Sequence, residues 1–125
     1  PAAASERSAL VSLHCPPTPE TPHFMNADRL KRMKRSGILI NTARGDVVEE
    51  KALIAALKDG TIAAAGLDVY EFEPKVSDEL LALENAVLLP HLGSASRETR
   101  VAMGMRVIDN VTAFFDGKTP GDRVA

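Results

Sequence analysis

The sequence predicts an α/β protein, with a parallel sheet and flanking helices. Four short apolar runs, each almost free of charge, are typical of strands in a parallel sheet: 9–13, 37–40, 62–67 and 86–89. Segments with helical start and stop residues separate the runs, as right-handed strand–helix–strand crossovers require. Because polar residues scarcely interrupt the runs, we expect the strands to be buried on both faces. The run 62–67 is rich in alanine and also suits a helix.

The first predicted helix begins after Asn26, a residue that can cap a helix N-terminus. Ala27, Leu30 and Met33 follow at helical spacing and share one face. Gly37 is expected to end this helix before the second strand.

Three further helices are predicted. One begins at the acidic pair 49–50 and ends before Gly60, since acidic residues favour a helix N-terminus. A short helix follows Ser77. A longer one follows Ser96, and Gly117 ends it.

Composition limits the classes of function. The 125 residues fit one domain, and 15 basic and 17 acidic residues give a net charge of −2. We therefore expect no nucleic-acid partner and no anionic membrane partner. No apolar run approaches the roughly 20 residues of a membrane span. The single cysteine, Cys15, excludes an internal disulfide and favours the cytoplasm, and the histidines lack metal-ligand spacing, so no metal site is expected.

Polar clusters follow each predicted strand. They occupy residues 14–19, 41–46, 68–74 and 90–94, and together they include an arginine, several carboxylates and histidines. In open parallel sheets, ligands bind beyond the carboxyl ends of the strands, where these clusters converge. The set predicts an anionic substrate and acid–base chemistry, without specifying the reaction.

At these clusters the sequence resembles the D-isomer-specific 2-hydroxyacid dehydrogenases, and within them most closely the glyoxylate/hydroxypyruvate reductases. The matching motifs keep the family's order and spacing over nearly the whole chain: Leu-His-Cys-Pro at 13–16, Ile-Asn-Thr-Ala-Arg-Gly-Asp at 40–46, Gly-Leu-Asp-Val-Tyr at 66–70 with Glu-Pro at 73–74, and Leu-Pro-His-Leu-Gly-Ser at 89–94. The resemblance implies an oxidoreductase that transfers hydride between NAD or NADP and a small 2-keto or 2-hydroxy acid. Members of the family also act as NAD(H)-sensing corepressors, which is the alternative function.

The resemblance also implies that part of the family's chain lies outside this sequence. None of the eight glycines forms the G-x-G-x-x-G loop that cradles the coenzyme pyrophosphate. The resemblance therefore implies that residues 1–95 are the second half of the NAD(P)-binding domain, with a Rossmann-like parallel sheet. Residues 96–125 are expected to be the C-terminal helix and tail that return to the substrate domain. The expected partners are the N-terminal part of the same protein, a small 2-keto acid and, in the complete protein, a second copy in a homodimer; the isolated chain should be inactive.

Three catalytic roles carry over from the family by position. Arg44 matches the arginine that grips the substrate carboxylate through two parallel hydrogen bonds. His91 matches the general acid/base, and Glu73 matches the carboxylate that holds the histidine ring in one tautomer. Glu71 is the rival for that last role, but the family places the acid directly before a proline, which selects Glu73.

The coenzyme contacts are also implied by the resemblance. Asp68 matches the residue that hydrogen-bonds the nicotinamide carboxamide, and Cys15 and Pro16 match the wall beside the adenosine. Thr18 and Glu20 lie in the same loop and could reach the coenzyme. The full predicted coenzyme set is Cys15, Pro16, Thr42, Ala43, Arg44, Asp68, His91, Gly93 and Ser94.

Overall fold

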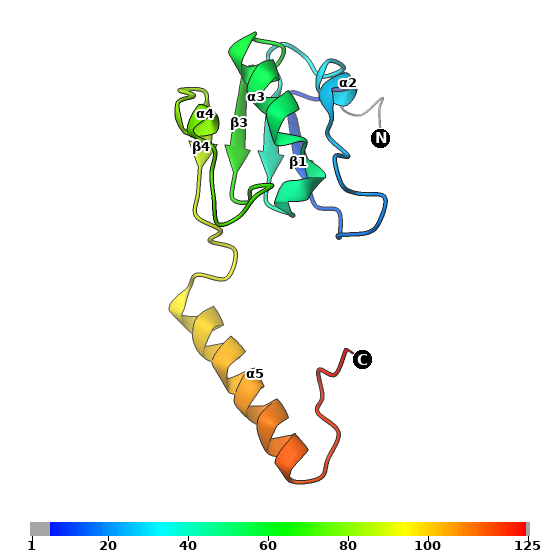
Figure 1. Ribbon diagram of the computed structural model, residues 1–125, viewed down its shortest axis with the longest axis vertical. Helices are drawn as coiled ribbons and strands as arrows, with labels where there is room; N and C mark the ends of the chain where they lie inside the picture. The colour runs from blue at the N-terminus through cyan, green and yellow to red at the C-terminus, as the bar shows by residue number, and fades with distance from the viewer. Residues whose placement is uncertain (1–5, 125) are drawn as a thin grey trace. The chain divides into compact units, whose positions relative to one another are not determined.

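The computed structural model describes residues 6–124 and contains one parallel sheet (Figure 1). Its strands are β1 (Leu10–Leu13), β2 (Ile38–Asn41), β3 (Ala64–Leu67) and β4 (Ala86–Leu88), in the spatial order β1-β2-β3-β4. Leu13 pairs with Asn41, Asn41 with Leu67, and Leu67 with Leu88, so the carboxyl ends of the four strands lie level. The predicted α/β architecture is confirmed, and the alanine-rich run 62–67 contributes a strand.

Short helices connect the strands. They are α2 (Ala27–Leu30), the 3₁₀ helix η1 (Gly45–Val47), α3 (Glu50–Lys58) and α4 (Asp78–Leu81). Asn26 caps α2 as predicted, because its side chain accepts a hydrogen bond from the Arg29 backbone N–H at 3.1 Å.

Helix α2 is shorter than the sequence predicts. The backbone N–H groups of Arg32 and Met33 bond to the carbonyls of Arg29 and Leu30, three residues back, so tight turns replace the helix before Gly37. Met33 is nevertheless buried. The pattern of apolar residues therefore predicts the burial of Met33 correctly, but it predicts a helix that is too long.

The sheet is buried on one face only, which corrects the expectation of burial on both. Leu39, Ala65 and Leu67 point into the core, whereas Ile38 and Val87 lie on the opposite face and are exposed. The strand order explains this difference, because successive right-handed crossovers in one direction place all their helices on the same side of the sheet. The strand sequences do not alternate between apolar and polar residues, because the exposed face of the sheet also carries apolar side chains.

The chain divides into two compact units, residues 1–91 and 92–125. The second unit contains α5 (Arg97–Phe115), whose N-terminus is capped by the Ser96 hydroxyl accepting from the Thr99 N–H at 3.2 Å. Apolar side chains of α5 such as Val101, Met105 and Ile108 are exposed. Between residues 6 and 124, no helix has the length and apolarity needed to cross a membrane.

Candidate functional site

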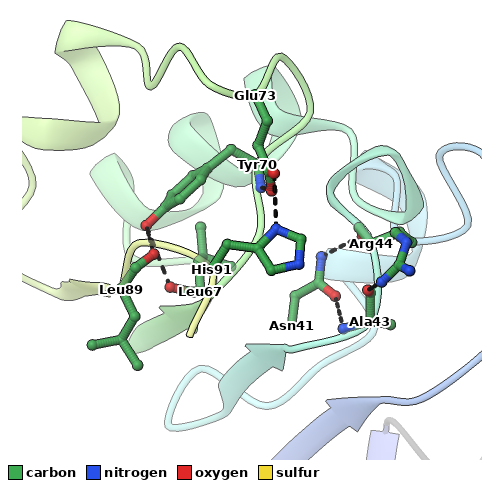
Figure 2. A network of polar contacts seen from close by, with 8 residues as sticks. All are labelled: Asn41, Ala43, Arg44, Leu67, Tyr70, Glu73, Leu89 and His91. Atoms are coloured by element: carbon green, nitrogen blue, oxygen red, sulfur yellow. Dashed lines mark hydrogen bonds and ion pairs between the residues drawn. The ribbon is translucent and has the colours of Figure 1, made fainter. Parts of the chain in front are cut away.

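Asn41 shapes the loop that carries Arg44. It is the last residue of β2 and is completely buried. Its side-chain amide donates to the Arg44 carbonyl at 2.8 Å, and its side-chain oxygen accepts from the Ala43 N–H at 3.1 Å (Figure 2). The two bonds satisfy a buried amide and fix the turn 42–44. Sequence reasoning assigned Asn41 no role, although a polar residue that closes an apolar strand was a usable signal.

The loop after Arg44 packs directly on the loop that follows β3. A β-carbon on Gly45 would lie 1.9 Å from the Tyr70 carbonyl oxygen and 2.6 Å from the Glu71 nitrogen, so only glycine fits there. The Arg44 guanidinium donates to the Ala43 carbonyl at 2.7 Å. The two loops are therefore in contact at the base of the site.

Tyr70 joins the loop after β3 to the end of β4. Its hydroxyl donates to the Leu89 carbonyl at 2.7 Å, and its backbone N–H donates to Glu73 Oε1 at 2.9 Å (Figure 2). Burial, followed by the negative charge of Asp68, raises the pKa of Tyr70, so the phenol remains a donor at neutral pH. From the sequence alone, Tyr70 was assigned no role in the site. Its position within the polar cluster 68–74 was the signal that could have found it.

His91 and Glu73 form a hydrogen-bonded pair, with 2.9 Å between His91 Nδ1 and Glu73 Oε2 (Figure 2). Burial acts to raise the pKa of Glu73. The hydrogen bond from His91, the Tyr70 N–H and the charges of His91 and Arg44 outweigh it and hold that pKa below its ordinary value. Glu73 is thus an anion at neutral pH, so Nδ1 donates and Nε2 is the ring nitrogen able to exchange a proton with a ligand.

Arg44, Glu73 and His91 line a single cavity of about 320 Å³. It therefore combines a guanidinium with an imidazole–carboxylate pair, a set suited to binding an anion and moving a proton. Pro17 also lines the cavity, although the sequence singled out its neighbour Pro16. The remaining lining residues are Gly45, Asp46, Tyr70 and Glu71.

A second, largely apolar cavity of about 420 Å³ lies along the exposed face of the sheet, and Thr42 and Asp68 border it. Asp68 is almost fully buried and follows the end of β3. A β-carbon on Gly66 would lie 2.9 Å from Ile40 Cδ1, so the absence of a side chain at Gly66 leaves room on this face of the sheet. Carboxylate oxygens beside an apolar surface suit a planar ring that carries an amide, which is the chemistry of a nicotinamide ring.

The other predicted coenzyme residues are more dispersed. Cys15 is half-buried against the core, Pro16 is exposed, and Ala43 packs on the core from the Arg44 loop. Gly93 and Ser94 belong to the second unit, where the Ser94 carbonyl accepts from Arg100 Nε at 3.0 Å. In the part of the chain that the structure describes, no three His, Cys, Asp or Glu side chains form a group that could hold a metal ion.

Comparisons with known proteins show the family to which the chain is similar. Residues 2–93 match the family model of the D-isomer specific 2-hydroxyacid dehydrogenase, NAD binding domain. A glyoxylate reductase of Korarchaeum cryptofilum is 54% identical over 120 residues, which are 95% of this chain and 36% of that protein. A glyoxylate/hydroxypyruvate reductase B of Erwinia tasmaniensis is 55% identical over 112 residues, 89% of this chain and 35% of that protein.

A solved structure shows the same fold. The NADPH-dependent glyoxylate/hydroxypyruvate reductase of Sinorhizobium meliloti, in complex with NADP and malonate, superposes with a TM-score of 0.85 at 46% identity. The match covers 91% of this chain and 36% of that one. The chain thus spans about a third of the length of the proteins it matches. On the family match, the four motifs and the shared fold, the chain belongs to the D-isomer-specific 2-hydroxyacid dehydrogenases.

Proposed function

We propose that this chain is the catalytic third of an NAD(P)-dependent 2-hydroxyacid dehydrogenase that reduces a small 2-keto acid such as glyoxylate or hydroxypyruvate. The observation that carries the proposal is the cavity lined by Arg44 and the His91–Glu73 pair. The reductase names of relatives more than 50% identical favour an enzyme over an NAD(H)-sensing corepressor.

Arg44 binds the substrate in this proposal. A planar guanidinium can donate two parallel hydrogen bonds to a carboxylate, and these fix the orientation as well as the position of the keto acid. The bonds from Asn41 to Ala43 and Arg44 preorganise the loop, so less freedom is lost when substrate binds.

His91 transfers the proton. In reduction, Nε2–H of the imidazolium gives its proton to the carbonyl oxygen as the carbonyl carbon accepts hydride, and the ring becomes neutral. In oxidation, neutral Nε2 takes the hydroxyl proton. Glu73 stays ionised throughout, stabilises the imidazolium and keeps Nδ1 protonated. When bound, the reduced nicotinamide coenzyme supplies the hydride.

The residues that would hold the coenzyme are assigned by their match to the family's motifs. We assign Asp68 to the carboxamide, with the loop 42–44 and the segment 15–16 beside the coenzyme. Gly93 and Ser94 complete the set.

The wider organisation follows from the family. We propose that residues 1–95 are the second half of the NAD(P)-binding domain, and that residues 96–125 lead back to the substrate domain. The N-terminal part of a longer protein and a second copy in a homodimer are the proposed partners. The cytoplasmic location stays a prediction that rests on the single cysteine.

His91→Asn in the complete protein that carries this chain tests the function, because asparagine tolerates the left-handed backbone at this position, φ 54°. Loss of a general acid/base typically costs 10²- to 10⁴-fold in rate, so NAD(P)H oxidation with glyoxylate or hydroxypyruvate should fall by at least about 100-fold. Coenzyme affinity, measured by calorimetry, should stay within about threefold.

The matched control is His14→Asn, which removes a histidine whose ring contacts the Ser12 hydroxyl at 2.8 Å and should leave turnover near that of the wild type. Wild-type turnover retained in His91→Asn would refute the catalytic assignment. If the wild-type protein oxidises NAD(P)H with none of the 2-keto acids tested, that result would favour the NAD(H)-sensing corepressor.

A further inference from the structure

A second histidine–glutamate pair lies beside the first. His23 Nε2 is 2.7 Å from Glu71 Oε1, and Glu71 is two residues before Glu73 in the same loop. His23 and His91 also share a left-handed backbone, with φ of 53° and 54°, and no other non-glycine residue among 6–124 has a positive φ. Such strained residues persist only where surrounding contacts hold them, and they cluster at functional sites.

Glu71 is bound at both carboxylate oxygens. Oε1 contacts His23, and Oε2 accepts from the Glu50 backbone N–H at 2.9 Å. In return, the Glu71 backbone N–H donates to Glu50 Oε2 at 3.4 Å, a longer contact. The Glu71 side chain is only 14% exposed. These bonds fix the loop after β3 to the first turn of α3.

His23 reaches the second loop of the site as well. Its backbone N–H donates to the Asp46 carbonyl at 2.7 Å, within η1 and two residues after Arg44. Because Gly45 packs on the peptide between Tyr70 and Glu71, a shift of either loop would be felt by the other. His23 thus contacts both loops that carry the substrate arginine and the partner of the catalytic histidine.

We infer that His23 and Glu71 are positioning residues that hold Glu73, and through it His91, in register with Arg44. The inference rests on the proposed function, since it names what keeps the proposed catalytic groups aligned. Neither side chain needs to touch the substrate or the coenzyme for this role. Placement errors of about 1 Å in catalytic groups can cost two orders of magnitude in rate, so contacts that only hold these groups in place can affect kcat.

A surface ion pair with no functional role is the alternative, because the His23 side chain is 49% exposed and such pairs contribute little. The alternative explains the His23–Glu71 contact alone. It does not account for the bond from the Glu50 backbone N–H to the second oxygen of Glu71, the bond to η1 or the left-handed backbone. The two ideas differ in what they predict for kcat.

The test uses Glu71→Gln, His23→Asn and their double variant in the complete protein. Glutamine has one carbonyl oxygen and cannot accept from both His23 and Glu50, whereas asparagine keeps the left-handed backbone but is too short to reach Glu71. We expect kcat per folded active site to fall about tenfold in each single variant, with the KM for the keto acid within threefold. The double variant should be no slower than the slower single variant, because the two residues act as a unit.

The matched control is Glu79→Gln, which removes the carboxylate of an exposed ion pair between α3 and α4, Lys58 Nζ to Glu79 Oε2 at 2.5 Å. Its kcat should stay within twofold of wild type. A second readout, long-range ¹H–¹⁵N NMR of the His91 ring, reports the tautomer without any turnover. Wild type should show Nδ1 protonated in the neutral ring, and the Glu71 and His23 variants a mixture of tautomers.

The inference is overturned if kcat in the Glu71 and His23 variants stays within twofold of wild type, if only KM changes, or if kcat falls while the His91 tautomer stays fixed. Unfolding of both single variants also overturns it, since the pair would then be purely structural. It is a separate outcome if the wild type turns over no keto acid while the His91 ring still becomes a mixture of tautomers in the variants. In that case the proposed function fails and the positioning role stands.

Discussion

The Tyr70 hydroxyl donates a 2.7 Å hydrogen bond to the carbonyl of Leu89, two residues before His91 in the chain. The same tyrosine donates its backbone N–H to Glu73. One residue therefore ties the loop of the acid to the strand end that leads to the histidine. This link helps to bring together two side chains that are 18 residues apart in the sequence.

Tyr70→Phe should weaken that link without leaving a cavity. The Leu89 carbonyl loses a donor, and the free energy of unfolding should fall by about 1–2 kcal/mol, measured by denaturant titration. Turnover of the complete protein that carries this chain should fall several-fold, because the end of β4 is less firmly placed. Thr61→Val, which removes a hydroxyl that donates to Asp59 in the turn after α3, is the comparison for turnover; an equal fall there would argue against a specific effect.

Gly45→Ala should be severely destabilising. The added methyl would lie 1.9 Å from the Tyr70 carbonyl oxygen, and backbone cannot move aside as a flexible side chain would. We expect a loss of more than about 3 kcal/mol or failure to fold, measured by thermal unfolding and soluble yield. Gly121→Ala is the control, because nothing lies within 4 Å of its added carbon. An unchanged melting temperature in Gly45→Ala would show that the two loops are not in contact.

The pKa of Glu73 should be below 4.5, its ordinary value, and should rise in His91→Gly. Glycine accepts the left-handed backbone, and removing the imidazole leaves burial as the strongest influence on the carboxyl. Carboxyl ¹³C NMR measures both pKa values. Glu79, whose pKa is lowered by its hydrogen bond to Lys58, serves as an internal control that should not respond.

The lowered pKa of Glu73 also sets a direction for stability against pH. The unfolded state binds more protons near pH 4.5, so this carboxylate stabilises the fold fully above that pH. The contribution is lost as pH falls through the lower pKa of the folded state. In Glu73→Gln, the dependence of unfolding free energy on pH should flatten in that window; an identical pH profile would count against the shift.

Arg44→Lys should separate charge from geometry. A lysine ammonium keeps the positive charge but cannot donate two parallel bonds to a carboxylate. The KM for the keto acid should rise about 10- to 100-fold, in steady-state assays of the complete protein, while coenzyme affinity changes little. Arg35→Lys, on the surface after α2, should leave KM unchanged. A KM within twofold of wild type in Arg44→Lys would remove Arg44 from substrate binding.

The sequence predicted the sheet well because apolar runs and turn residues act locally. The four strands lie where the runs lie, and all four polar clusters that follow them supply residues of one cavity. Burial on a single face could not be read in the same way, because the side of the sheet that the helices cover depends on strand order. Residues such as Ile38 are apolar and yet exposed.

The contacts that hold the site together were the least predictable part. Asn41 makes two hydrogen bonds to the backbone of the loop that follows it, and the Tyr70 hydroxyl bonds to the carbonyl of Leu89 in another segment. Such bonds leave no periodic pattern in a sequence. Glu71 could be named only as a rival to Glu73. Its partner, His23, is 48 residues away, and the fold alone brings them together.

The left-handed backbone at His91 limits what the position can become. In a saturation library at codon 91, a screen for well-folded protein would enrich glycine, asparagine and aspartate, which tolerate this backbone best. On the proposed function, a screen of the complete protein for NAD(P)H oxidation with a 2-keto acid would retain histidine alone. Folding and chemistry thus select different amino acids at one position, so drift away from histidine would leave a stable protein that no longer turns over its substrate.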